Sequence, residues 1–350
     1  MTGRPGRGTA PAALAAAAAG LLLAACTHAG SALRVEPIVN FALPPTTAGC
    51  GGAVPLADGA QRLPITVSTV DGQTGEMINV CLAGQGPYPF VIDSGAGETV
   101  IDAKLANQLH LASTGPATAI EGVGCTADAH SVMVNSWSAA GASLAPQTMT
   151  AAHLPDFGIK GQPDGLLGSD VLSRFGAVRI DFGAQTLTLG GPEALAVTSS
   201  SEVDGPTGTP PPAVLTTGGA GTTVPLKVNL STGAFSMTVR VRIKGPSSHN
   251  FVIDTGSSQS VTASSVAAAE HLVTTDLAQR QTTVCSIVTV PLVHSGSWSL
   301  PGVALRPQLI GSVDLGPISS NGTVGLIGSD VLKQFGWVIL DYSGGRLILG

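Results

Sequence analysis

Charged side chains are scarce in this chain. They make up 11% of the 350 residues, against roughly 25% in typical soluble domains, and the formal net charge is −6. The sequence has no run of lysine or arginine that could form a basic surface for a polyanion. We therefore expect no nucleic-acid partner.

The signatures of several common enzyme classes are also missing. No group of histidines and cysteines has the spacing of a zinc site, and the glycines at 95 and 97 are not followed by the Lys-Ser/Thr pair of a phosphate-binding loop. No Gly-x-Ser-x-Gly elbow supports a serine hydrolase. The sequence thus gives no reason to expect a metal or an organic cofactor.

Helical periodicity is weak, whereas glycine and proline are abundant, with 46 and 24 residues. Strand-like stretches occur at 65–70 and 77–82, with a turn signal between them. Short helices are expected at 102–111, capped by Asp102, and from Ser169 or Asp170 to Gly176. This pattern predicts an all-β protein with a few short helices.

The first 25 residues have the pattern of a secretory signal peptide. Arg4 and Arg7 form a short positive region, and residues 11–25 are an alanine- and leucine-rich run too short to span a membrane comfortably. The run ends in Leu-Ala-Ala followed by Cys26, which resembles a bacterial lipobox. That resemblance implies cleavage before Cys26, lipidation of its thiol and attachment to the outer face of the cell membrane. The alternative is an ordinary signal peptide, with Cys26 discarded or free.

Composition divides the rest of the chain. Residues 26–62 are rich in Ala, Pro, Gly and Thr, which favours a flexible tether between the anchor and the folded part. Residues 191–223 are rich in Gly, Pro, Ser and Thr and are typical of a linker. The sequence therefore predicts two folded segments, 63–190 and 224–350.

The two folded segments repeat one another. Residues 90–96 (FVIDSGA) return as residues 251–257 (FVIDTGS), and residues 168–172 and 328–332 share the sequence GSDVL. The aspartates of the first pair are 161 positions apart (254 − 93), and the glycines that begin the second pair are 160 apart (328 − 168). A repeat of this size is a duplicated domain-sized unit, because solenoid repeats are much shorter.

Each copy places a carboxylate where a short apolar run ends. Such a run before a turn reads as a strand buried on both faces, and a carboxylate there is costly unless it is used or paired. One Asp-Ser-Gly alone would be an ordinary turn. Two copies in matching surroundings suggest that Asp93 and Asp254 meet.

These motifs resemble the aspartic proteases. In that family an apolar pair precedes Asp-(Ser/Thr)-Gly, and an apolar-apolar-Gly run follows about seventy residues later, as Leu166-Leu167-Gly168 and Leu326-Ile327-Gly328 do here. The short segments look most like retropepsin lobes. The resemblance implies a bilobal acid-protease fold, with two β-barrel lobes related by a pseudo-twofold axis within one monomeric chain.

The resemblance also implies the site residues. Asp93 and Asp254 would be the catalytic pair, and Ser94, Gly95, Thr255 and Gly256 would support it. Two carboxylates at about 3 Å hold one proton between them, so that one can activate water while the other protonates the scissile carbonyl. Peptide substrates would bind in an extended conformation between the lobes.

Four cysteines remain after Cys26, and they allow three pairings. Cys125 and Cys285 are repeat equivalents, and Cys125 lies where a retropepsin-like lobe places its flap tip. The hypothesis is a disulfide that joins the two flaps, which leaves Cys50 and Cys81 as the second pair. Two unpaired thiols, or other pairings with Cys50 and Cys81, remain open.

The predicted function is therefore an aspartic endopeptidase of the cell envelope, anchored by lipid at Cys26. An alternative of a different class is a catalytically inactive lipoprotein that uses the same cleft to bind peptides or proteins.

Overall fold

The computed structural model describes residues 33–46, 49–56, 59–155, 162–191, 221–231 and 234–350. The expected signal peptide, Cys26 and nearly all of the expected linker lie outside these residues. Within the described part of the chain, no helix is both long enough and apolar enough to cross a membrane.

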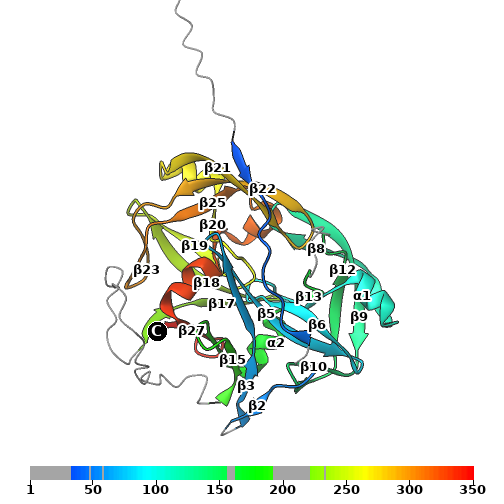
Figure 1. Ribbon diagram of the computed structural model, residues 1–350. Coiled ribbons are helices and arrows are strands. Elements are labelled where there is room, and N and C mark those ends of the chain that lie inside the picture. Colours follow the sequence, from blue (N-terminus) through cyan, green and yellow to red (C-terminus); the bar gives the residue numbers. More distant parts are fainter. Residues whose placement is uncertain (1–32, 47–48, 57–58, 156–161, 192–220, 232–233) are drawn as a thin grey trace, which may run out of the picture. The chain divides into compact units, whose positions relative to one another are not determined.

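The fold is all-β with a few short helices, as the sequence predicted (Figure 1). Two large sheets each contain one of the repeated aspartate motifs. The eleven-stranded sheet contains β1 (Arg34–Glu36), β17 (Lys227–Ser231), β18 (Ala234–Ile243), β19 (Ser248–Ile253), β20 (Val261–Ala263), β21 (Val273–Thr282), β22 (Ile287–His294), β23 (Trp298–Leu300), β24 (Val303–Leu305), β25 (Leu309–Val313) and β26 (Thr323–Ile327). The ten-stranded sheet contains β4 (Thr66–Val70), β5 (Gln73–Leu82), β6 (Gln85–Ile92), β7 (Val100–Asp102), β8 (Ser113–Gly122), β9 (Cys125–Val134), β10 (Trp137–Ala139), β11 (Ala142–Leu144), β12 (Gln147–Ala152) and β13 (Gly165–Leu167).

A third sheet draws strands from both halves of the chain. It contains β2 (Val54–Pro55), β3 (Gln61–Pro64), β14 (Ala177–Asp181), β15 (Thr186–Leu189), β16 (Thr222–Pro225), β27 (Trp337–Asp341) and β28 (Arg346–Leu349). In this sheet, β14 and β15 form an antiparallel hairpin. The outer edge of β14 pairs antiparallel with β27, which removes an exposed strand edge from each half. This pairing joins the β14–β15 hairpin of one half to the β27–β28 hairpin of the other.

The helices are short. They are α1 (Ala103–Gln108), α2 (Ser169–Leu172), α4 (Ser264–Ala269) and α5 (Ser329–Leu332), with the 3₁₀ turns η3 (Ser173–Phe175), η4 (Gly316–Asn321) and η5 (Lys333–Phe335). Asp102 caps α1 as expected, since its carboxylate accepts from the backbone N–H of Lys104 at 2.8 Å. The expected cap of the second helix was wrong: α2 begins after Gly168, and the Ser169 hydroxyl bonds elsewhere.

The two aspartate-bearing strands occupy equivalent positions in their sheets. β6 pairs parallel with β13, and β19 pairs parallel with β26, in matching registers. Phe90 of β6 and Phe251 of β19 are fully buried. The prediction that the strands are buried on both faces was wrong in part, because Val91 and Val252 point to the opposite face and line a cleft.

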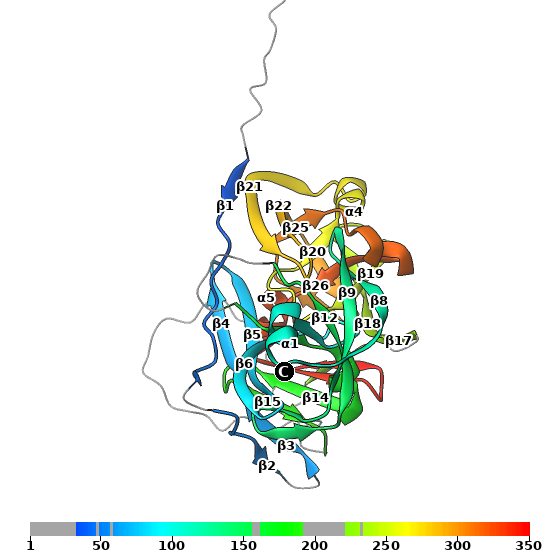
Figure 2. The same cartoon turned by 90° about the vertical axis from the view of Figure 1, so that its right-hand side faces the viewer.

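The expected tether at 26–62 is contradicted over its described residues. β1 pairs parallel with β21, β2 pairs with β3, and Cys50 is joined to Cys81 in β5 by a disulfide. The composition, rich in Ala, Pro, Gly and Thr, did not reveal these contacts, because strand pairing and a disulfide depend on distant segments rather than on a periodic apolar pattern. In Figures 1 and 2 the chain descends from β1 beside β21 toward β4 and β5.

Candidate active site

Asp93 and Asp254 each lie where the central strand of a sheet ends. The N–H of Asp93 donates to the Leu167 carbonyl at 3.0 Å, and the N–H of Asp254 donates to the Ile327 carbonyl at 3.0 Å. The apolar-apolar-Gly runs therefore fix the strand ends from which the aspartates emerge. The same backbone geometry in both halves brings the two loops face to face.

The two carboxyl groups are in contact and share a hydrogen bond. Each also packs against the glycine of the opposite loop. A methyl group added to Gly95 would lie 2.4 Å from Cγ of Asp254, and one added to Gly256 would lie 2.3 Å from Cγ of Asp93. Glycine is needed at both positions because any side chain would push the carboxylates apart.

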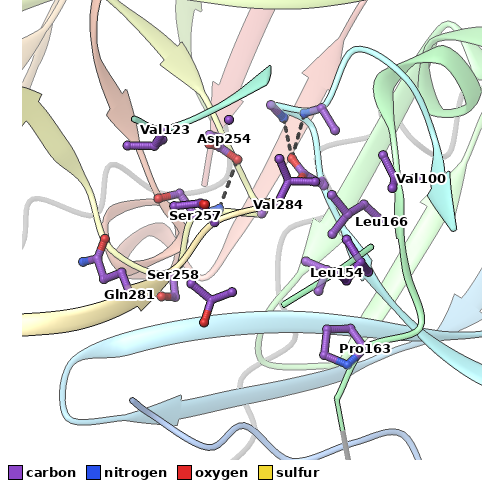
Figure 3. Close-up of a pocket in the computed structure, with 18 of the residues that line it drawn as sticks. Val100, Val123, Leu154, Pro163, Leu166, Asp254, Ser257, Ser258, Gln281 and Val284 are labelled. Carbon is purple, nitrogen blue, oxygen red and sulfur yellow. Dashed lines mark hydrogen bonds between the residues drawn. The ribbon is translucent and has the colours of Figure 1, made fainter. Parts of the chain in front are cut away.

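Backbone amides of each loop orient its own carboxylate. Oδ1 of Asp93 accepts from the N–H groups of Gly95 at 2.9 Å and Ala96 at 2.8 Å. Oδ1 of Asp254 accepts from the Ser257 N–H at 3.0 Å. A dashed line in Figure 3 marks the bond between Asp254 and Ser257. The inner oxygen of each carboxyl is thus held, and the rest of the group faces its partner and the cleft.

Burial raises the pKa of both aspartates. For Asp93, desolvation is opposed by the hydrogen bonds from its loop amides. For Asp254, desolvation and then the charge of Asp93 raise the pKa well above its usual range. The pair therefore carries one proton over a wide pH range, and its two titration steps belong to the pair rather than to either residue.

Ser94 and Thr255 lock the two loops together. Ser94 Oγ donates to the Ile253 carbonyl at 2.9 Å, and Thr255 Oγ1 donates to the Ile92 carbonyl at 2.7 Å. Each hydroxyl also accepts from the backbone N–H of the other residue, at 2.9 and 3.1 Å. All four bonds are buried. Because Ser94 follows Asp93 and Thr255 follows Asp254, these bonds fix the separation of the two aspartates.

Two repeat-equivalent serines lie behind the loops, and each meets a different titratable group. Ser169 Oγ donates to the Ser94 carbonyl and lies 2.8 Å from the Tyr342 hydroxyl. Ser329 Oγ lies 2.7 Å from Oε2 of Glu76, to which it donates. Burial raises the pKa of Glu76 to about 8, and burial also raises the pKa of Tyr342 above its usual value. At neutral pH both groups are therefore protonated.

Sequence reasoning missed Glu76. It is fully buried, and its Oε1 has no hydrogen-bond partner among the described residues. The repeat contained a usable signal, since the position 161 residues later is Met237. A carboxylate in one copy opposite a methionine in the other marks a place where the two halves differ.

Two β-hairpins cover the site from opposite halves. Their tips lie between β8 and β9 and between β21 and β22, and the structure joins them through a disulfide between Cys125 and Cys285. The tips also pack across one another, because a methyl group at Gly122 would lie 2.7 Å from Cγ1 of Val284. The cysteine bridge hypothesised from the flap position is thus the one that the structure contains.

The cleft between the hairpins and the aspartates has a volume of about 610 Å³. Its walls are mainly apolar in two patches. One patch, from the first half, includes Val100, Leu154 and Leu166 and is covered by Val284 of the opposite hairpin. The other includes Val261 and Leu326 and is covered by Val123. Each flap valine therefore lies over the patch of the other half (Figure 3).

A family model described as "Aspartyl protease" matches residues 78–171. This stretch contains Asp93, the first hairpin and the Leu-Leu-Gly run. Residues 78–171 form an aspartyl protease-like domain. A comparison of the chain with curated proteins found no match. In the described residues, no group of three or more His, Cys, Asp or Glu side chains is placed to hold a metal ion.

Proposed function

We propose that this protein is an aspartic endopeptidase whose catalytic pair is Asp93 and Asp254. The observation that carries the proposal is the reciprocal packing of each carboxyl against the glycine of the opposite loop. That packing brings two carboxyls into hydrogen-bond contact at the floor of a cleft. A pair of turns in a binding protein would have no need of this arrangement.

Peptide hydrolysis by this pair requires one proton on its two carboxyls, and the raised pKa of both buried aspartates supports that state. The ionised member of the pair takes a proton from a water held between the two carboxyls, and that water attacks the scissile carbonyl. The protonated member donates its proton to the carbonyl oxygen, which gives a neutral tetrahedral intermediate. Collapse of the intermediate transfers a proton to the leaving amine and returns the pair to a single proton, so no covalent enzyme intermediate forms.

The two halves act as duplicated lobes in this proposal. The matching registers of β6 with β13 and of β19 with β26 support it, as do the equivalent flap hairpins. An extended peptide would lie between the flaps and the aspartates, with apolar side chains directed to the two patches on either side of the pair. The substrate class is therefore peptides or proteins that can present an extended, apolar segment.

The proposed place of action is the outer face of the cell membrane. It rests on the apolar run at 11–25 and on the lipobox-like sequence at Cys26. The two disulfides are consistent with an extracytoplasmic, oxidising compartment. Metabolic labelling with a fatty-acid probe, compared between the wild type and a Cys26→Ser variant, tests the anchor.

The test of the activity uses the full chain purified in mild detergent. It is incubated with a peptide library from pH 3 to 8, with and without a pepstatin-like inhibitor, and the products are sequenced by mass spectrometry. Inhibitor-sensitive cuts support the protease. Peptide binding without any cut would instead support the inactive binding lipoprotein.

A further inference from the structure

One end of the cleft is bordered by a segment that the repeat does not contain. Residues 37–45, here called the strap, follow β1 and lead toward Cys50. Ile38, Val39, Asn40 and Phe41 of the strap line the cleft. The strap therefore forms part of the wall that a substrate meets.

The strap is fixed at both ends to different halves of the fold. Before it, β1 pairs with β21, and Glu36 lies opposite Gln279 in the register. After the cleft-lining residues, the Ala42 N–H donates to Ser68 Oγ at 3.1 Å, and Asn79 Nδ2 donates to the Pro45 carbonyl at 3.1 Å. The strap thus crosses from the second flap hairpin to the sheet of the first half.

Phe41 holds the middle of the strap against β5. A methyl group at Gly75 would lie 3.1 Å from Cδ2 of the Phe41 ring, so the ring rests directly on the glycine. Ile38 and Val39 are half-buried, as is Phe41. Strand pairing, two hydrogen bonds and a packed ring therefore hold the strap in a fixed position beside the cleft.

The strap lies at the end of the cleft marked by Ser258 and Gln281. Gln73 and Thr74, which directly precede Gly75 in β5, both bond to Ser258. The Thr74 N–H donates to the Ser258 carbonyl at 3.0 Å, and the Ser258 hydroxyl donates to Oε1 of Gln73 at 2.9 Å. Figure 3 shows Ser258 and Gln281 on one side of the cleft and Leu154 and Pro163 on the other.

Among the residues that the structure describes, no segment equivalent to the strap lines the opposite end. The counterpart of β21 is β8, which ends its sheet without an outer partner strand in the part of the chain that the structure describes. Gly97, the counterpart of Ser258, also lines the cleft. Among the described lining residues, strap residues therefore occur beside Ser258, and the two ends of the cleft differ although the aspartate motifs are equivalent.

We propose that the strap closes one end of the cleft and so limits how far a substrate extends on one side of the scissile bond. An extended peptide advances about 3.3 Å per residue, so a fixed obstacle beside the cleft excludes residues beyond a short reach. Favoured substrates then place few residues in the cleft on that side of the scissile bond. This inference rests on the proposed protease function and names the geometry of its substrates.

The test uses two peptide series built around one bond that the full-length protein cuts. One series is lengthened on the amino side of the bond and the other on the carboxyl side. We expect kcat/KM to rise with length on one side and to stay flat or fall by about tenfold on the other. The Phe41→Ala and Ile38→Ser variants should relieve the penalty on that side alone. Leu43→Ala is the matched control, because Leu43 lies in the strap but not among the residues lining the cleft.

Three outcomes separate the strap from the protease itself. Equal gains from extension on both sides in the wild type would overturn the strap inference and leave the protease standing. Faster cutting by the strap variants with an unchanged side preference would also overturn it, since the strap would then be a general obstruction. If the wild type cuts nothing, the proposed activity fails, and the two series are built instead around a peptide that the full-length protein binds. Fluorescence anisotropy of these labelled peptides then measures the side preference, and equal affinity gains from extension on both sides would overturn the strap inference.

Discussion

Thr255 and Ser94 each donate a hydroxyl hydrogen bond across the boundary between the two halves, Thr255 to the Ile92 carbonyl at 2.7 Å and Ser94 to the Ile253 carbonyl at 2.9 Å. Both carbonyls belong to the residue that precedes an aspartate of the pair. Buried hydrogen bonds therefore set the separation of the two carboxyls.

Removing the Thr255 hydroxyl should destabilise the protein. In Thr255→Ala the Ser94 N–H and the Ile92 carbonyl both lose a buried partner, so we expect the free energy of unfolding to fall by about 1–3 kcal/mol. Urea denaturation measures it. Thr255→Ser keeps the hydroxyl and should stay within about 1 kcal/mol of the wild type, because it loses only a methyl group. Equal stability of the alanine variant and the wild type would contradict the assigned bonds.

Glu76 should make stability depend on pH. Its folded-state pKa is raised from 4.5 to about 8 by burial, so between these values the folded protein keeps a proton that the unfolded chain releases. The stabilisation is complete below pH 4.5 and is lost as the pH rises toward 8, at about 1 kcal/mol per pH unit.

The Glu76→Gln variant tests this directly. Its neutral amide cannot ionise, so the free energy of unfolding should vary less with pH between 5 and 8 than in the wild type. Glu121→Gln removes an exposed carboxylate and serves as the control, with an unchanged pH dependence. An unchanged slope in the Glu76 variant would mean that this group is ionised in the fold.

The features that could be predicted from the sequence are those that occur in both copies of the repeat or that follow from local rules. Two copies of FVID(S/T)G were enough to predict that Asp93 and Asp254 meet, because one strand–turn pattern appears twice in matching surroundings. The all-β fold and the Asp102 cap followed from local rules about turns and capping. Such features depend on neighbours along the chain and can be recognised without the rest of the fold.

The features that sequence reasoning missed depend on contacts between distant segments. The strap has a tether-like composition, and only its pairing with β21 and its packing on Gly75 show that it belongs to the fold. Glu76 is an ordinary polar residue at a strand start until Ser329 is seen to bond it from the other half. The third sheet likewise arises from pairing of β14 with β27, which neither hairpin encodes alone.

The flap disulfide should contribute strongly to stability. It joins residues 160 apart in the sequence, so its removal frees a long loop in the unfolded chain. We expect the Cys125→Ser, Cys285→Ser double variant to lose about 2–5 kcal/mol of unfolding free energy. Mild reduction of the wild type should reproduce the loss if Cys50–Cys81 stays intact, which peptide mapping checks. No difference between oxidised and double-variant protein would argue that the flaps are not bridged.

Gly95 should tolerate no side chain. A methyl group there would lie 2.4 Å from Cγ of Asp254, so Gly95→Ala must separate the two carboxyls. We expect a loss of at least about 100-fold in kcat/KM toward any cleaved peptide, because misplaced catalytic groups lose rate steeply. Gly183→Ala is the control, since its methyl group would meet nothing closer than 3.7 Å. Full activity of the Gly95 variant would show that the carboxyls need not touch.

The central claim is that one proton shared by Asp93 and Asp254 drives peptide hydrolysis. The most direct measurement compares cleavage by the wild type with cleavage by Asp93→Asn and Asp254→Asn, with folding checked by circular dichroism and with Asp181→Asn as a control in a hairpin turn far from the pair in sequence. We predict that each dyad variant loses at least about 10³-fold in rate while the control keeps its activity. Cleavage by either dyad variant at the wild-type rate would contradict the account.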